Sequence, residues 1–186
     1  MKQVTSHIIA RIRSFRKNAE GSLSVETVLI FPILLWVYIA MFVYFDVFRE
    51  ENTNLKAAYT VSDLLSRRLD GVDEAYIDGM NDIFDYLTNS TDPTWIRVSV
   101  IKWDDHNDEY KVDWSYATKS KPPHTDTTIN TLAHKIPELP VGDSLIVVET
   151  TMTYKPMFNA GFGELQLENF VVTRPRFAPQ LVWIGS

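Results

Sequence analysis

The sequence of 186 residues predicts an α+β protein, in which a long N-terminal transmembrane and stalk helix is followed by a small antiparallel-sheet head. Three observations predict this outline. Residues 28–45 form an apolar run without a charge. Helical spacing of apolar residues continues beyond that run, and alternation of apolar and polar residues begins near residue 95. We therefore expect one membrane anchor and one head with its own hydrophobic core.

The apolar run is long enough to cross a bilayer. It reads VLIFPILLWVYIAMFVYF over residues 28–45. A helix counted from residue 25 to residue 45 spans about 31 Å at a rise of about 1.5 Å per residue, which matches the hydrocarbon thickness. The alternative interpretation is a buried core helix of a soluble protein, although such a helix rarely runs this far without a polar residue.

The charges on the two sides of this run have opposite signs. Residues 1–20 carry a net charge of +4, and residues 49–186 carry −8, within a total of −6. The positive-inside rule predicts a cytoplasmic N-terminus, with the head on the other side of the membrane. The acidic head also argues against nucleic acid binding, which needs basic residues on the folded surface.

The residues around the apolar run do not form an ordinary secretion signal. Such a signal is cut after its apolar segment at small residues, whereas bulky and charged residues follow here at positions 45–49. A different pattern precedes the run: Gly21 is followed by four residues and then by Glu26. Glycine leaves an unhindered backbone on which a protease can act.

This order of basic leader, glycine, four residues, glutamate and apolar helix resembles that of type IV prepilins. Within it, residues 21–35, GSLSVETVLIFPILL, resemble the TadE-like pseudopilins (TadE, TadF and TadG) of the tight-adherence (Flp) pilus system. Two further segments, SDLLSRR at residues 62–68 and TRPRFAPQLVW at residues 173–183, are similar to parts of TadE/TadG-like proteins. One difference is that Thr27 follows the glutamate, where the family often has an aromatic residue.

The resemblance implies a structural subunit of a pilus or secretion assembly that is not an enzyme and needs no cofactor. It implies cleavage by a prepilin peptidase between Gly21 and Ser22, which makes Glu26 the fifth residue of the mature chain. Pro32 also matches the family. The implied location is the bacterial inner membrane, crossed once, with the head in the periplasm. The implied partners are the peptidase, other pilus or pseudopilin subunits, inner-membrane assembly proteins and the lipid bilayer.

Glu26 and Pro32 are the expected assembly residues. A carboxylate in a bilayer costs on the order of 2.5–3.5 kcal/mol at the centre and less near the interface, so it usually has a partner. Our hypothesis is that Glu26 pairs with the new α-amino group of Ser22 on a neighbouring subunit; the alternative is that it lies in water at headgroup level. Pro32 lacks an amide hydrogen, so it should kink the helix or connect it to a neighbour through the freed carbonyl.

The elements expected after the anchor give the remaining organisation: a leader at 1–21, a transmembrane helix at 22–48, a stalk helix at 49–71 and a head at 72–186. The stalk shows a helical stripe that ends at Asp70-Gly71. The stripe contains Leu55, Ala58, Tyr59, Ser62, Leu65 and Leu69. A second helix is expected over residues 73–87 and a short one over residues 128–134.

Four strands are expected in the head, over residues 95–103, 110–116, 144–154 and 165–173. The first two flank a polar loop and should form a hairpin. In the second strand, Tyr110, Val112, Trp114 and Tyr116 alternate with polar residues, which predicts that these four share one face.

The sequence offers no catalytic or metal-binding residue that we would assign. There is no cysteine, which excludes disulfides and thiolate chemistry. The acidic hairpin at residues 104–109 could hold a cation, but a calcium loop counted from Asp104 needs glycine and glutamate where Glu109 and Ser115 stand. A solvated hairpin tip is the simpler interpretation. Arg174 and Arg176 either close the head through hydrogen bonds or bind an anionic partner.

Two other functions stay open beside the pilus subunit. One is an unprocessed, single-pass membrane-anchored periplasmic domain that binds a ligand or a sensor partner. The other is an anchored metal-dependent enzyme built on the acidic hairpin.

Overall fold

The computed structural model describes residues 19–90, 92–158, 161 and 163–185, with side chains from residue 23 onward. Most of the expected leader, residues 1–18, lies outside this part of the chain. The chain divides into two units. The first contains Met1–Phe45 and Met157–Gly161, and the second contains Asp46–Pro156 and Phe162–Ser186.

The expected anchor and stalk belong to one helix, α2 (Ala19–Ser66), which contains Pro32 in its interior. The helix ends at Ser66 rather than at Asp70. The Ser66 hydroxyl donates to the carbonyl of Asp63 at 2.8 Å, and the Ser66 carbonyl accepts the backbone N–H of Arg176 at 2.7 Å. A segment from the far end of the chain therefore satisfies the helix terminus, which the local stop signal could not reveal.

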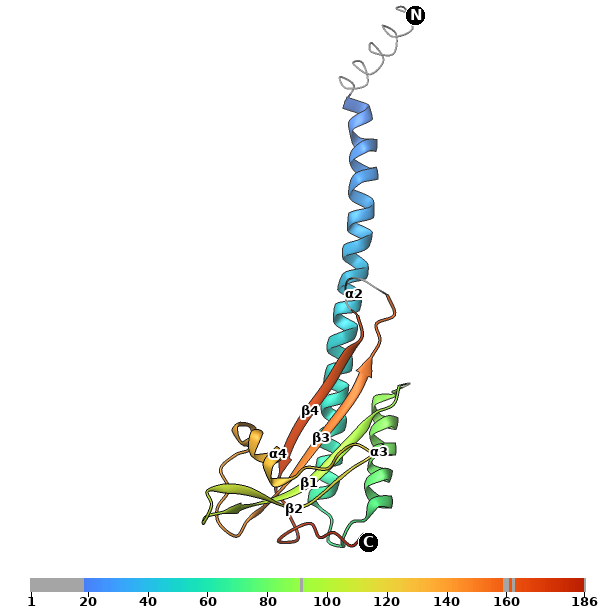
Figure 1. Ribbon diagram of the computed structural model, residues 1–186. Helices are drawn as coiled ribbons and strands as arrows, with labels where there is room; N and C mark the ends of the chain where they lie inside the picture. The colour runs from blue at the N-terminus through green and yellow to red at the C-terminus, as the bar shows by residue number, and fades with distance from the viewer. Residues whose placement is uncertain (1–18, 91, 159–160, 162, 186) are drawn as a thin grey trace, which may run out of the picture. The chain divides into compact units, whose positions relative to one another are not determined.

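The second unit contains a four-stranded antiparallel sheet with the order β2-β1-β3-β4 (Figure 1). The strands are β1 (Trp95–Asp104), β2 (Glu109–Ala117), β3 (Ser144–Tyr154) and β4 (Leu165–Thr173). These bounds agree with the four predicted strands to within one residue. The predicted α+β class is confirmed.

Three short helices complete this unit: α3 (Glu74–Thr88), α4 (Asp126–Thr131) and the 3₁₀ helix η1 (Ala133–Lys135). The carboxylate of Asp73 caps α3 by accepting the N–H of Tyr76. A capping box between Thr125 and Thr128 starts α4 two residues before its expected beginning. The predicted single helix over residues 128–134 is thus the end of α4 followed by η1.

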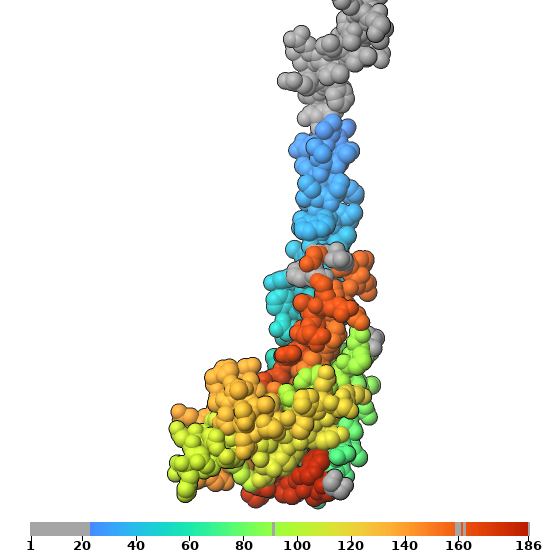
Figure 2. Space-filling view, viewed as in Figure 1, coloured from blue at the N-terminus to red at the C-terminus, as the bar shows by residue number. Residues whose placement is uncertain are grey.

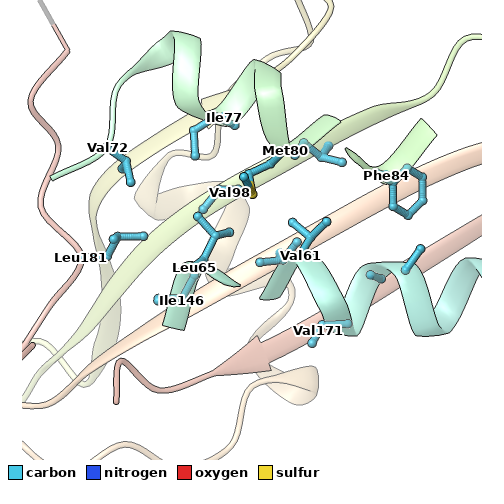
Figure 3. Close-up of a cluster of buried hydrophobic side chains, with 14 of the residues drawn as sticks. Val61, Leu65, Val72, Ile77, Met80, Phe84, Val98, Ile146, Val171 and Leu181 are labelled. Carbon is cyan, nitrogen blue, oxygen red and sulfur yellow. The ribbon is translucent and has the colours of Figure 1, made fainter. Parts of the chain in front are cut away.

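A hydrophobic core lies between the sheet and the helices α2 and α3 (Figure 3). It includes Val61, Leu65, Ile77, Met80, Phe84, Val98, Ile146, Val148, Val171 and Leu181. The predicted stripe on α2 is half right. Ala58, Ser62 and Leu65 are buried, whereas Leu55, Tyr59 and Leu69 are exposed. Ala57 and Val61, which are outside the predicted stripe, are buried in the core in their place.

The predicted single apolar face of β2 is wrong, because a β-bulge interrupts the strand. Val100 pairs with Trp114 but Ile101 pairs with Val112, so Asp113 has no partner in β1. The extra residue reverses the alternation. Trp114 and Tyr116 consequently pack against the core described above, while Tyr110 and Val112 face the opposite side of the sheet.

That opposite side carries a second, smaller core formed with the segment that includes α4 and η1. Its buried members are Ile101, Tyr110, Ile129, Ile136, Leu139, Leu145 and Val147. Helix α4 also covers the outer edge of β2: Asn130 Oδ1 accepts the N–H of Tyr110 at 2.9 Å, and Asp126 Oδ1 accepts the N–H of Val112 at 2.8 Å. These side chains replace a neighbouring strand and block pairing at this edge.

Candidate functional site

The predicted cleavage residues, Gly21 and Ser22, lie in the first turn of α2. The structure describes their backbone but not their side chains. A peptidase acts on extended backbone, so this turn would have to unwind before cleavage. Glycine lowers the cost of unwinding, because it is less favourable than alanine within a helix by about 0.8–1 kcal/mol.

Glu26 lies on an apolar face of α2. An open hollow of about 320 Å³ runs along this face and is lined by Leu23, Glu26, Thr27, Ile30, Phe31 and Leu34. The hydroxyl of Thr27 donates to the carbonyl of Leu23 at 2.8 Å and so satisfies its own polar group. Among the described residues, Glu26 has no hydrogen bond or ion pair. A carboxylate among apolar side chains that has no partner in the described part of its chain is suited to meet a cation on another molecule.

The apolar side chains around Glu26 are exposed. Within the described chain, α2 is the one helix that is long and apolar enough to cross a membrane. Of its most apolar stretch of 18 residues, 6% is buried. Figure 2 shows this helical segment in blue, with its side chains at the surface. A core helix would have most of these side chains covered, so the core-helix alternative is wrong for this segment. The exposure is consistent with a single-pass membrane protein.

The helix α2 continues through Pro32 without a break. Because proline has no N–H, the carbonyl of Val28 lacks the donor that a residue four positions later normally supplies. Val28 is itself 70% exposed. A carbonyl on the exposed surface of an apolar helix is available to a donor on a neighbouring helix.

The acidic hairpin tip uses its side chains to shape the turn between β1 and β2. The carboxylate of Asp104 accepts the side-chain amide of Asn107 at 2.8 Å and the backbone N–H of His106 at 3.0 Å. These two bonds, the Asn107 bond first, lower the pKa of Asp104. Glu109 forms an ion pair with Lys111. In the part of the chain described, no three His, Asp or Glu side chains gather as metal ligands.

The structure also reveals a buried charged cluster, formed by His124, Arg97 and Glu149, that the sequence did not predict. The ring of His124 is 5% exposed, with Nε2 2.7 Å from Glu149 Oε2 and Nδ1 2.9 Å from Thr128 Oγ1. Arg97 Nε lies 2.5 Å from the same carboxylate oxygen. One signal could have predicted a partner for Glu149: it is the single charged residue in the strand SLIVVETTMTY.

In this cluster the hydrogen bonds together change the pKa of Glu149 more than burial does. Burial by itself raises the pKa of Glu149, but the bonds from His124 and Arg97 bring the pKa below its ordinary value. Arg97 also donates to the carbonyl of Pro122 at 3.0 Å, and the N–H of His124 donates to Ser115 Oγ at 2.8 Å. The cluster therefore attaches the segment before α4 to the sheet. A polar hollow of about 380 Å³ beside it is lined in part by Trp95, Arg97 and Glu149.

The two arginines of the TRPRF segment pair with acidic residues inside the same unit. Arg174 Nη1 lies 3.3 Å from Asp143, and Arg176 Nη2 lies 3.2 Å from Asp63 on α2. These contacts, with the backbone bond from Arg176 to Ser66, close the end of the head and support the first of the two interpretations of this segment.

Compared with known proteins, the chain matches no protein-family model, no curated protein and no solved structure.

Proposed function

We propose that the chain is a pilin-like structural and assembly subunit of a tight-adherence (Flp) pilus, anchored in the bacterial inner membrane with its head in the periplasm. One observation carries the proposal: an exposed apolar helix is preceded by Gly21, four residues and Glu26, and the Glu26 carboxylate has no partner among the described residues. The resemblance to TadE-like pseudopilins supports the same function, as does the α+β head that follows the helix.

In this proposal, a prepilin peptidase removes residues 1–21 and leaves Ser22 with a free α-amino group. A neighbouring subunit then places that amino group beside Glu26. Two opposite charges that approach within about 4 Å attract one another more strongly in a low-dielectric environment than in water. The pair would therefore set the axial register of one helix against the next. The carbonyl of Val28, which Pro32 leaves without a donor, would form a second contact.

The intact mass of the membrane-extracted chain tests the processing step. Co-expression with a prepilin peptidase should remove the mass of residues 1–21, and Gly21→Val should block this removal because a branched side chain hinders the backbone. Gly79→Ala is the matched control, since an added Cβ at Gly79 meets no atom within 4 Å. A chain that keeps Met1 in the presence of the active peptidase contradicts the proposal and favours an unprocessed anchored binding or sensor-partner domain.

The assembly step has a separate test. Glu26→Ala should still be cut but should fail to join sheared pili, because the new amino group loses its partner. Glu51→Ala is the control: this carboxylate is exposed on the same helix but lies beyond the apolar run. Normal incorporation of the Glu26→Ala subunit would exclude the proposed pairing.

A further inference from the structure

The loop that joins β3 to β4 has an apolar tip between two polar ends. Met157 is 78% exposed and Phe158 is 46% exposed. Lys155 and Glu164, at the two ends of the loop, lie 3.8 Å apart, and Lys155 also pairs with Asp92 at 2.6 Å. Exposed apolar side chains at the tip of a loop are unfavourable in water unless something covers them.

The apolar tip contacts the apolar helix. The ring of Phe158 packs edge to face against the ring of Phe42, with their centroids 6.3 Å apart. Both residues belong to the first unit, together with Met157. Phe42 is three residues before the end of the uncharged run, which corresponds to a depth of about 4.5 Å along a helix. Apolar groups at membrane interfaces insert to about 5–10 Å, a similar depth.

We propose that Met157 and Phe158 insert into the lipid of the bilayer beside Phe42 and form a second membrane attachment of this chain. The proposal rests on the membrane anchor of the proposed function. Lipid is the occupant because the tip continues the exposed apolar surface of α2, while the charged side chains stay at the ends of the loop. The loop leaves β3 next to Tyr154, whose hydroxyl donates to Asp46 at 2.6 Å, and Asp46 is the first charged residue after the apolar run.

The absence of cysteine allows a direct test in the full chain. A nitroxide label is attached at Met157→Cys, and the chain is reconstituted into vesicles of phosphatidylcholine and phosphatidylglycerol. Collision rates with oxygen, which concentrates in lipid, and with a water-soluble nickel chelate report the depth of the label. Leu34→Cys in the apolar run is the lipid reference. Val141→Cys is the aqueous control, because it precedes the opposite end of β3 and is 66% exposed.

The label at Met157 should collide with oxygen several-fold more often, relative to the nickel chelate, than the label at Val141. If the ratio of oxygen collisions to nickel-chelate collisions is equal at positions 157 and 141 while the Leu34 label lies in lipid, the proposal is overturned. A Met157 label shielded from both reagents would indicate a protein partner and would also overturn it. If the Leu34 label is itself accessible to the nickel chelate, the membrane anchor fails and the second attachment fails with it.

A second variant tests the contact with Phe42. In a chain that also carries Phe158→Ser, the collision ratio of the Met157 label should approach that of the aqueous Val141 label, because the ring that packs on Phe42 is gone. Phe177→Ser, at an exposed position outside this loop, should leave the ratio unchanged. A Met157 label that stays at lipid depth in the Phe158→Ser chain would overturn the role given to Phe158.

Discussion

The hydroxyl of Tyr154 donates a hydrogen bond to Asp46 Oδ2 at 2.6 Å. Tyr154 is the last residue of β3, and Asp46 is the first residue of α2 that belongs to the second unit. The bond therefore attaches the end of a central strand to the helix at the point where the sequence changes from apolar to charged. Burial first, and then the bond to Asp46, raise the pKa of Tyr154 to about 12.

Tyr154→Phe should lower the free energy of unfolding of the head by about 1.5–3 kcal/mol, the range for a hydrogen bond to a charged group. Denaturant unfolding of the full chain in detergent, followed by tryptophan fluorescence, measures the change. Tyr86→Phe is the matched control because Tyr86 is 85% exposed, and it should change stability by less than about 0.5 kcal/mol. Equal effects of the two substitutions would show that the bond to Asp46 contributes nothing.

The raised pKa of Tyr154 also predicts a loss of stability at alkaline pH. Since the folded state keeps this proton to about pH 12 and the unfolded state releases it near 10.0, stability is complete below pH 10 and falls as the pH rises between these values. The difference in tyrosinate absorbance between the wild type and Tyr154→Phe should show a group that titrates near pH 12. A difference spectrum that titrates near pH 10 would contradict the buried bond.

Glu149→Gln should destabilise the head by about 1–3 kcal/mol at neutral pH, because Arg97 and His124 then share a neutral acceptor. The pKa of Glu149 is lowered in the folded state, so its contribution is present above the ordinary value of 4.5 and is lost as the pH falls through the folded value. The two proteins should therefore become similar in stability at low pH. Glu168→Gln, an exposed carboxylate on β4, serves as the control. A difference that persists unchanged at low pH would argue against the charge of Glu149 as the cause.

Deletion of Asp113 should unfold or strongly destabilise the head, because it removes the bulge and turns one half of β2 to the wrong face. Burial of a large apolar side chain contributes about 1.5–3 kcal/mol, and either Trp114 with Tyr116 or Tyr110 with Val112 would lose it. The substitution Asp113→Asn keeps the bulge and is the control. Near-UV circular dichroism reports the packing of Trp114, and a native spectrum after the deletion would contradict the bulge.

Replacement of two glycines by alanine should change the stability of the protein in opposite directions. At Gly71 an added Cβ would lie 2.4 Å from Ile184 Cγ2 and 3.2 Å from the carbonyl of Val182, so Gly71→Ala should cost about 1–3 kcal/mol. At Gly79 an added Cβ meets nothing within 4 Å, so Gly79→Ala should stabilise α3 by about 0.5–1 kcal/mol. Denaturant midpoints compare the two variants, and midpoints that shift in the same direction would contradict this difference.

Features set by a local pattern could be predicted from the sequence. Strand β3 agrees with its prediction at both ends, because alternation over eleven residues and flanking turn residues define it without help from the rest of the chain. The two faces of β2 could not be predicted, since the bulge at Asp113 depends on pairing with β1. The partner of His124 was missed for a similar reason: Glu149 is 25 residues away in the sequence.

The sequence by itself determined the apolar helix and the pattern of Gly21 and Glu26, because the length of an uncharged run and the spacing along one helix need no tertiary contact. The tertiary structure decided where α2 ends, which face each half of β2 presents, how Glu149 is paired and that Phe158 reaches Phe42. Each of these features depends on contacts between segments far apart in the chain. Such contacts form only when folding has brought the segments together at an entropic cost, so no local pattern reveals them.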